Sequence, residues 1–309
     1  MNAARRLVSS RVTRPLHVTE IPVALALVAV YLIWGSTYLA VRIALASFPP
    51  LLLSSLRFLL AGGLLYLVLR GRGVPTPSPG QWVWAAIIGG FLFCICQGGV
   101  AFAQQWVPSG FAAIGIATIP LWTTLFLGIW RQWPHRREWF GLVIGFVGVL
   151  LLNMGGAFRA SPTGAALVLV AAASWGLGSV WKSHLSIPAG LMTNAAEMLA
   201  GGALLLFFHL LVERQQPGPI TLPAIGAILY LAVFGGIIVY SAYVYLLRRI
   251  SFPLATSYAY VNPLVAVGLG LGLGGERPSL MELLALVVIL VGAGCLLLKS
   301  RERTSGKAV

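Results

Sequence analysis

Long apolar runs alternate with short polar gaps along the whole 309-residue chain. A helix that crosses a bilayer needs about 20 mostly apolar residues. The gaps between the runs hold the Pro and Gly clusters that interrupt helices, for example residues 75–79 (PTPSP). The pattern predicts an all-α integral membrane protein with ten transmembrane helices, at residues 21–46, 50–70, 81–104, 109–130, 138–154, 163–185, 188–212, 222–247, 253–274 and 279–298.

The composition supports this prediction and excludes a soluble protein. Hydrophobic residues make up 59% of the chain and charged residues only 9%, whereas a soluble domain has roughly 25% charged residues. The mean hydropathy is +0.91. A chain of this length with so few charged residues cannot form a water-facing surface, so we expect the lipid bilayer to be its solvent.

The basic residues predict the orientation of the chain. They give a net charge of +14, but they lie in short clusters between the apolar runs, so we expect no nucleic-acid partner. If the N-terminus is cytoplasmic, the opposite side receives only Arg159, Arg214 and Arg277. The positive-inside rule then predicts that both termini face the cytoplasm of a bacterial cell, with basic segments at 1–20 and 299–309.

An internal repeat divides the chain into two halves. Four motifs of the first half recur in the same order in the second, which predicts five-helix repeats at 21–154 and 163–298. Because five is odd, the second repeat enters the membrane from the opposite side, and inverted pairs of this kind are typical of alternating-access transporters. The matched segments are 34–35 with 175–176, 61–63 with 200–202, 111–120 with 254–263, and 138–152 with 282–296.

Two charged residues inside predicted spans are candidates for function. An ionised carboxylate at the centre of a bilayer costs roughly 2.5–3.5 kcal/mol on insertion scales. Glu197 therefore fits either a proton-coupling site, a contact to a cationic group, or a structural ion pair. Arg57 lies at the corresponding position of span two, where it fits either an anchor for an anionic solute group or a structural partner, including a partner of Glu197. Arg42 lies near a span end, where we expect its side chain to extend toward the interface.

Two prolines mark a candidate hinge. Pro120 and Pro263 occupy matched positions in spans four and nine, and each removes the N–H that would bond the carbonyl four residues earlier, at Ile116 and Ala259. Broken helices at matched depths point to a binding site between the repeats. The alternative is a kink without function, which membrane helices tolerate.

Polar and aromatic residues recur at helical spacing in several spans. They suit a cavity that binds a solute by ring contacts and a few hydrogen bonds, and they also suit packing between helices. The predicted solute contacts are Trp34, Tyr38, Gln97, Trp175, Tyr240, Tyr258 and Asn262. The glycine pair at Gly141 and Gly145 fits either packing within the chain or a dimer face.

The chain lacks the usual motifs of enzymes and ATPases. It has no phosphate-binding loop, no nucleophile elbow, and no His or carboxylate cluster with metal-ligand spacing. We therefore expect no catalytic residue, no metal, no cofactor and no direct use of ATP.

Several stretches resemble the EamA family of the drug/metabolite transporter superfamily, and among its members the inner-membrane exporters. The resemblance implies a ten-helix, two-repeat fold with a central cavity and export of amino acids, metabolites or toxic compounds. It supports Trp34, Gly35, Arg57, Pro120, Glu197, Asn262 and Pro263 as framework or pathway residues. The second repeat departs from the first where Gly35-Ser36-Thr37 becomes Gly176-Leu177-Gly178. The stretches are 34–42 (WGSTYLAVR), 57–65 (RFLLAGGLL), 104–113 (QQWVPSGFAA), 117–122 (ATIPLW), 197–202 (EMLAGG), 254–267 (LATSYAYVNPLVAV) and 272–276 (GLGGE).

Taken together, the sequence predicts a secondary active exporter of small amphipathic metabolites in the bacterial inner membrane. The expected partners are a small-molecule solute, the lipid bilayer and, if Glu197 is a coupling site, protons. The chain would act as a monomer or homodimer. The alternatives are an importer or exchanger of sugars or organic anions, and a membrane receptor or scaffold without transport.

Overall fold

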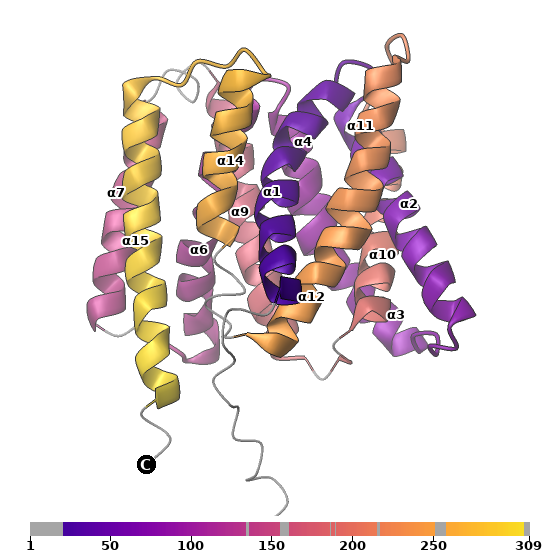
Figure 1. The fold of residues 1–309 in the computed structure, drawn as a ribbon, viewed down its shortest axis with the longest axis horizontal. Coiled ribbons are helices and arrows are strands. Elements are labelled where there is room, and N and C mark those ends of the chain that lie inside the picture. Colours follow the sequence, from indigo (N-terminus) through magenta and orange to yellow (C-terminus); the bar gives the residue numbers. More distant parts are fainter. Residues whose placement is uncertain are drawn as a thin grey trace, which may run out of the picture.

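The protein forms a bundle of helices whose axes run roughly parallel (Figure 1). A computed structural model describes residues 21–133, 136–154, 161–185, 187–188, 190–214, 217–250 and 258–305. The predicted basic segment 1–20 lies outside the described residues. The last helix continues to Ser305, so residues 299–305, predicted to be part of a tail, are helical.

The helices follow the predicted apolar runs closely. The first half holds α1 (Ile21–Ala44), α2 (Pro50–Gly71), α3 (Pro79–Gly89), η1 (Gly90–Gly98), α4 (Gly99–Ala103), α5 (Ser109–Ile116), α6 (Ile119–Phe126), η2 (Leu127–Trp130) and α7 (Arg136–Met154). The second holds α9 (Pro162–Ser183), α10 (Leu191–Val212), α11 (Leu222–Ala232), η3 (Val233–Ile238), α12 (Val239–Arg249), α14 (Tyr258–Gly272) and α15 (Leu280–Ser305).

Seven helical segments of the described chain are long and apolar enough to cross a membrane, and three shorter apolar helices occupy the remaining predicted spans. The shorter ones are Trp139–Leu151, Val261–Gly272 and Leu280–Gly292. Part of predicted span nine, at residues 251–257, lies outside the described residues. The count of ten spans therefore stays a prediction.

Departures from regular α-helix occur in both halves. Predicted spans three and eight each contain a π-helical segment, η1 and η3, a deviation that is frequent at functional sites. Pro120 does not kink the middle of a continuous helix as predicted. Span four is divided into α5 and α6, and Pro120 is the second residue of α6, where a missing N–H costs little. Pro263 lies inside α14, as predicted.

Helices of one half pack against helices of the other, and the pattern of contacts stays the same when the two halves are exchanged. α2 packs against α10 and α7 against α15, so each pair joins corresponding spans of the two repeats. α1 packs against α14, and the corresponding pair α6 and α9 is also in contact. Figure 1 shows α7 beside α15 and α1 beside α14. This symmetric pattern of contacts fits the two-repeat membrane fold predicted from the sequence.

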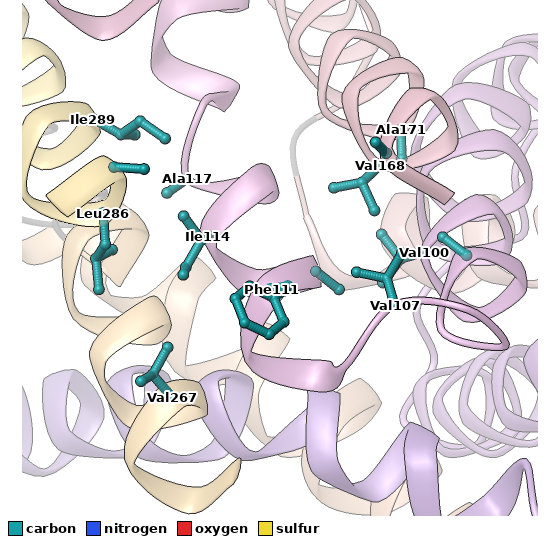
Figure 2. Close-up of a cluster of buried hydrophobic side chains, with 14 of the residues drawn as sticks. Val100, Val107, Phe111, Ile114, Ala117, Val168, Ala171, Val267, Leu286 and Ile289 are labelled. Atoms are coloured by element: carbon teal, nitrogen blue, oxygen red, sulfur yellow. The ribbon is translucent and has the colours of Figure 1, made fainter. Parts of the chain in front are cut away.

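A buried apolar cluster centred on α5 joins the halves. Figure 2 shows Phe111 and Ile114 of α5 between Leu286 and Val267 of the second half on one side and Val100 and Val107 of the first on the other. Phe111 and Ile114 are 4% and 0% exposed. The position of α5 therefore depends on both halves, which matters below because α5 borders the candidate site.

Glycine allows the closest helix approaches. A Cβ at Gly62 of α2 would lie 2.9 Å from the backbone N of Leu199 in α10. A Cβ at Gly292 of α15 would lie 2.5 Å from the backbone N of Gly145 in α7 and 2.8 Å from the carbonyl O of Gly141. The Gly141–Gly145 pair is thus used for packing within the chain.

Replacing Gly292 tests this contact. We expect Gly292→Ala to push α7 and α15 apart, because the atoms it meets are backbone atoms that cannot rotate away. Overpacking of this kind costs on the order of 1–3 kcal/mol. The matched control is Gly294→Ala on the same helix, where no heavy atom lies within 4 Å. Thermal unfolding in detergent should show a lower Tm for Gly292→Ala only, and equal Tm values for the two variants would contradict the packing.

Candidate functional site

A cavity lies between the two halves, lined by residues of α1, α2, η1, α4, α5, α6, α9 and α14. It encloses about 70 Å³ of free space. Pockets for drug-sized ligands measure roughly 300–1,000 Å³, so this cavity must widen to take up a large solute. The lining residues are Trp34, Thr37, Tyr38, Val41, Arg57, Cys96, Gln97, Val100, Gln104, Ala113, Ile116, Ala117, Ile119, Trp175, Tyr258, Ala259, Asn262 and Pro263.

Six of the seven predicted solute contacts lie on the cavity wall. The exception is Tyr240, which is buried beside the wall and packs edge-on against Trp34, with ring centroids 5.1 Å apart. Trp34 also contacts Tyr258 at 4.6 Å and Tyr243 at 5.5 Å. Trp34 is therefore the centre of an aromatic cluster that forms one side of the cavity, and Tyr240 supports it from outside.

Asn262 is held by backbone carbonyls. With its amide nitrogen toward them, it donates to the carbonyl of Tyr31 at 3.1 Å and to that of Tyr258 at 3.2 Å. The bond to Tyr31 joins α14 to α1, and both bonds fix the side chain, which is 8% exposed, at the cavity wall. Asn262 thus positions the helix as well as lining the cavity.

Arg57 places a buried guanidinium in the cavity wall. Nη2 lies 3.5 Å from Oε1 of Gln97, a long hydrogen bond, and the guanidinium sits 4.3 Å from the ring centroid of Phe58. Nε has no hydrogen-bond partner. Within the described part of the chain, no carboxylate lies within 4.0 Å of this guanidinium. The predicted alternative of a pair with Glu197 is therefore wrong for this structure.

Glu197 instead pairs with Lys182. Its Oε2 accepts a hydrogen bond from Lys182 Nζ at 2.7 Å, and the same Nζ donates to Asn194 Oδ1 at 3.2 Å. Glu197 lies in the second turn of α10, near a helix end rather than at the centre of a span, and it is not on the cavity wall. Its Oε1 is buried without a hydrogen-bond partner.

Gln104 is one of the polar residues at helical spacing in predicted span three, and it lines the cavity, although the predicted solute contacts do not include it. It is 8% exposed, and neither its amide oxygen nor its nitrogen has a hydrogen-bond partner. The sequence held a signal, because Gln104 lies seven residues after Gln97, on the same helical face. Thr37 and Cys96 were also not selected, although both line the cavity.

Ile116 and Ala259, whose carbonyls lack a helical N–H donor because a proline lies four residues later, both line this cavity. Ile116 precedes Pro120 by four residues, Ala259 precedes Pro263 by four, and both line the wall. Pro263 lines it as well, whereas Pro120 does not. These repeat-matched residues thus border one shared space.

One end of the bundle is closed by a carboxylate at the N-terminus of α5. Glu276, in the loop after α14, accepts hydrogen bonds from the backbone N of Ser109 at 2.7 Å, from Ser109 Oγ at 2.6 Å and from the backbone N of Gly110 at 2.9 Å. It also pairs with Arg42. Arg42, which we expected only to extend toward the interface, therefore joins α1 to this cluster. Burial opposes ionisation of Glu276, but the bonds from Ser109, Gly110 and Arg42 outweigh it and hold its pKa below the usual value.

A second carboxylate acts in the same way at the same end. Glu213, just after α10, accepts hydrogen bonds from the backbone N of Leu51 at 3.1 Å and of Leu52 at 3.2 Å, at the start of α2. Its Oε2 lies 2.7 Å from His209 Nδ1. Nearby, Ser47 donates to the carbonyl of Pro219 at 2.9 Å. The contacts of Glu213 with α2 and of Ser47 with Pro219 join the first half to the second.

The architecture agrees with a comparison against known families. The EamA-like transporter family matches residues 21–154 and 162–298. The chain belongs to the EamA family. Its family assignment, its helical structure and its relatives make it a multi-pass transporter of the inner membrane.

Individual relatives of this EamA protein carry few functional details. It is 46% identical over 272 residues to the uncharacterized inner membrane transporter YedA of Escherichia coli (strain K12), covering 87% of this chain and 88% of YedA. It is 26% identical to protein PagO of Salmonella typhimurium, covering 88% and 92%. A solved crystal structure superposes with a TM-score of 0.62 over 90% of this chain and 98% of that one, at 22% identity, which shows the fold alone.

The Glu276 cluster predicts a pH dependence of stability. Because the pKa of Glu276 is lower in the folded protein than its usual value of 4.5, its contribution is complete above about pH 4.5 and is lost as the pH falls through the lowered pKa. Glu276→Gln should therefore lower the Tm at neutral pH, by an amount corresponding to on the order of 1–3 kcal/mol. The Tm difference from wild type should shrink in acid. A difference that is constant over the whole acid range would contradict an ionised Glu276 at the α5 N-terminus.

Proposed function

We propose that this protein is a secondary active transporter that exports small amphipathic metabolites, such as amino acids or drug-like compounds, by alternating access. The observation that carries the proposal is the cavity itself. It is walled by both halves, it is lined by the repeat-matched residues Ile116 and Ala259, and it lies between ends at which polar contacts join the halves. A space of this kind can open to either side without unfolding a helix.

The two ends of the bundle support an exchange between two states. At the Glu276 end, ion pairs and helix-capping bonds join the halves. At the other end, the Gln132 amide lies 3.3 Å from His184 Nε2, and the His184 ring stacks on Trp130 at 4.6 Å. With both termini cytoplasmic, as we propose from the positive-inside rule, the Glu276 end faces the periplasm. Export then requires the Glu276 contacts to open while the His184 contacts hold.

In this proposal the wall residues bind the solute and Arg57 supplies the only cation among the lining residues. Trp34, Tyr38, Trp175 and Tyr258 offer ring faces and edges to an apolar body. Gln97 and Asn262 offer amide groups. Tyr240 acts by fixing the ring of Trp34 and contacts no solute directly.

Flux measurements test the transport proposal. Proteoliposomes loaded with a panel of amino acids and amphipathic drugs should accumulate or release at least one compound faster than protein-free liposomes. An imposed pH gradient separates active transport from facilitated equilibration. If no compound moves under any gradient while the protein is folded, the proposal fails in favour of a receptor or scaffold.

Proton coupling through Glu197 is the finer part of the proposal. Protonation of Glu197 would release Lys182, which is 2.7 Å away and lies in the last turn of α9. We expect Glu197→Gln to keep exchange of solute across the membrane but to lose the dependence of accumulation on the pH gradient. The matched control is Glu213→Gln, another buried carboxylate beside a base, which lies at the opposite end. Full gradient dependence in Glu197→Gln would remove Glu197 as the coupling site and leave the structural ion pair.

A further inference from the structure

The cavity carries an uncompensated positive charge. Arg57 is the one charged residue among the described lining residues, and its side chain is buried, with 4% of the residue exposed. Arginine stays protonated in proteins, and a buried charge without a partner is costly. The ring of Phe58 offers only partial compensation.

The membrane carboxylate does not neutralise this charge. Glu197 forms an ion pair with Lys182, and the pair has no net charge. The two carboxylates at the Glu276 end also have partners. Glu276 contacts Arg42 and the α5 N-terminus, and Glu213 contacts His209 and the α2 N-terminus. A negative charge at Arg57 must therefore come from outside the described part of the chain.

Unused hydrogen-bonding groups line the same space. Arg57 Nε has no partner, and its only hydrogen bond to a side chain, to Gln97, is long at 3.5 Å. Gln104 is buried with a free donor and a free acceptor. Buried polar groups are nearly always hydrogen-bonded in folded proteins, so three unpartnered atoms in one wall indicate a ligand that completes them.

We propose that Arg57 binds an anionic group of the transported solute, with Gln104 as a second polar contact. The cavity then selects carboxylates with a compact apolar or aromatic body over cations of the same shape. The aromatic wall of Trp34 and Tyr258 receives that body. This assignment rests on the proposed transport function and narrows its solutes to anions. Arg57 sets the charge that the site accepts.

Three probes that share a benzyl-like body test the charge preference. Benzoate, benzylammonium and benzyl alcohol carry a negative, a positive and no charge, and their binding to the full protein in nanodiscs is measured by calorimetry at neutral pH. A charge-assisted hydrogen bond implies that benzoate binds at least about tenfold more tightly than benzyl alcohol, with benzylammonium weakest. Equal affinities, or tightest binding of benzylammonium, would overturn the proposal. Displacement of benzoate by millimolar chloride would instead assign an inorganic-anion site and would also overturn it.

A near-isosteric substitution beside Arg57 provides the decisive variant. Gln97→Glu places a carboxylate at the position where Oε1 now lies 3.5 Å from Nη2, so it should pair with Arg57 and occupy it. We expect benzoate affinity to fall at least about tenfold while benzylammonium affinity rises. The matched control is Gln105→Glu, on an exposed residue outside the wall. Unchanged benzoate affinity in Gln97→Glu would reject the proposal.

Substitutions of Arg57 itself give a second readout. Arg57→Lys keeps the charge and should retain the preference for benzoate with weaker binding, whereas Arg57→Gln should lose the preference. If Arg57→Gln does not fold, Gln97→Glu still decides. The binding and flux measurements can contradict the two proposals independently of each other. Benzoate binding that depends on Arg57 without any flux contradicts transport alone, and flux without charge preference contradicts this inference alone.

Discussion

One end of this bundle depends on two carboxylates that the second half places at helix N-termini of the first half. Glu276 binds the start of α5 and Glu213 binds the start of α2. The first N–H groups of a helix have no partner within it, and in apolar surroundings water cannot replace one. Each carboxylate therefore accepts hydrogen bonds from N–H groups of the first half that have no partner within their own helix. Separating the halves at this end breaks both sets of bonds together.

The same constraint explains why the cavity differs from the rest of the interior. Elsewhere in the described chain, Glu197, Glu213 and Glu276 each meet a cation or a helix N-terminus. At the cavity wall, Arg57 and Gln104 retain unpartnered atoms. An apolar bundle tolerates such groups only at a cost. Three of these atoms lie in one space between the two halves, and this supports the proposed binding site.

The sequence predicted those parts of the structure that depend on local pattern. Hydropathy located the helices, and the scarcity of polar residues within spans led to Arg57, Gln97 and Asn262 at the wall. It could not identify Lys182 as the partner of Glu197, because the two residues lie in different predicted spans and only the fold brings α9 and α10 together at this point. The pairing of Arg42 with Glu276 joins residues that are 234 positions apart, which no local pattern reveals. The π-helical segments η1 and η3 depend on how neighbouring helices pack.

The two ends of the bundle are built from matched positions with different chemistry. When Glu138 is aligned with Glu282, Gln132 takes the place of Glu276, and its contact with His184 is a hydrogen bond between groups that carry no formal charge when the imidazole is neutral. The other end uses an ion pair and helix capping. The repeats also differ in the first span, where Ser36 bonds Tyr230 at 2.6 Å and its counterpart is an apolar Leu177. An exchange of conformations between the halves would therefore join two states of unequal free energy. In the proposed transport cycle, a solute or proton that binds to the charged groups would change that difference directly.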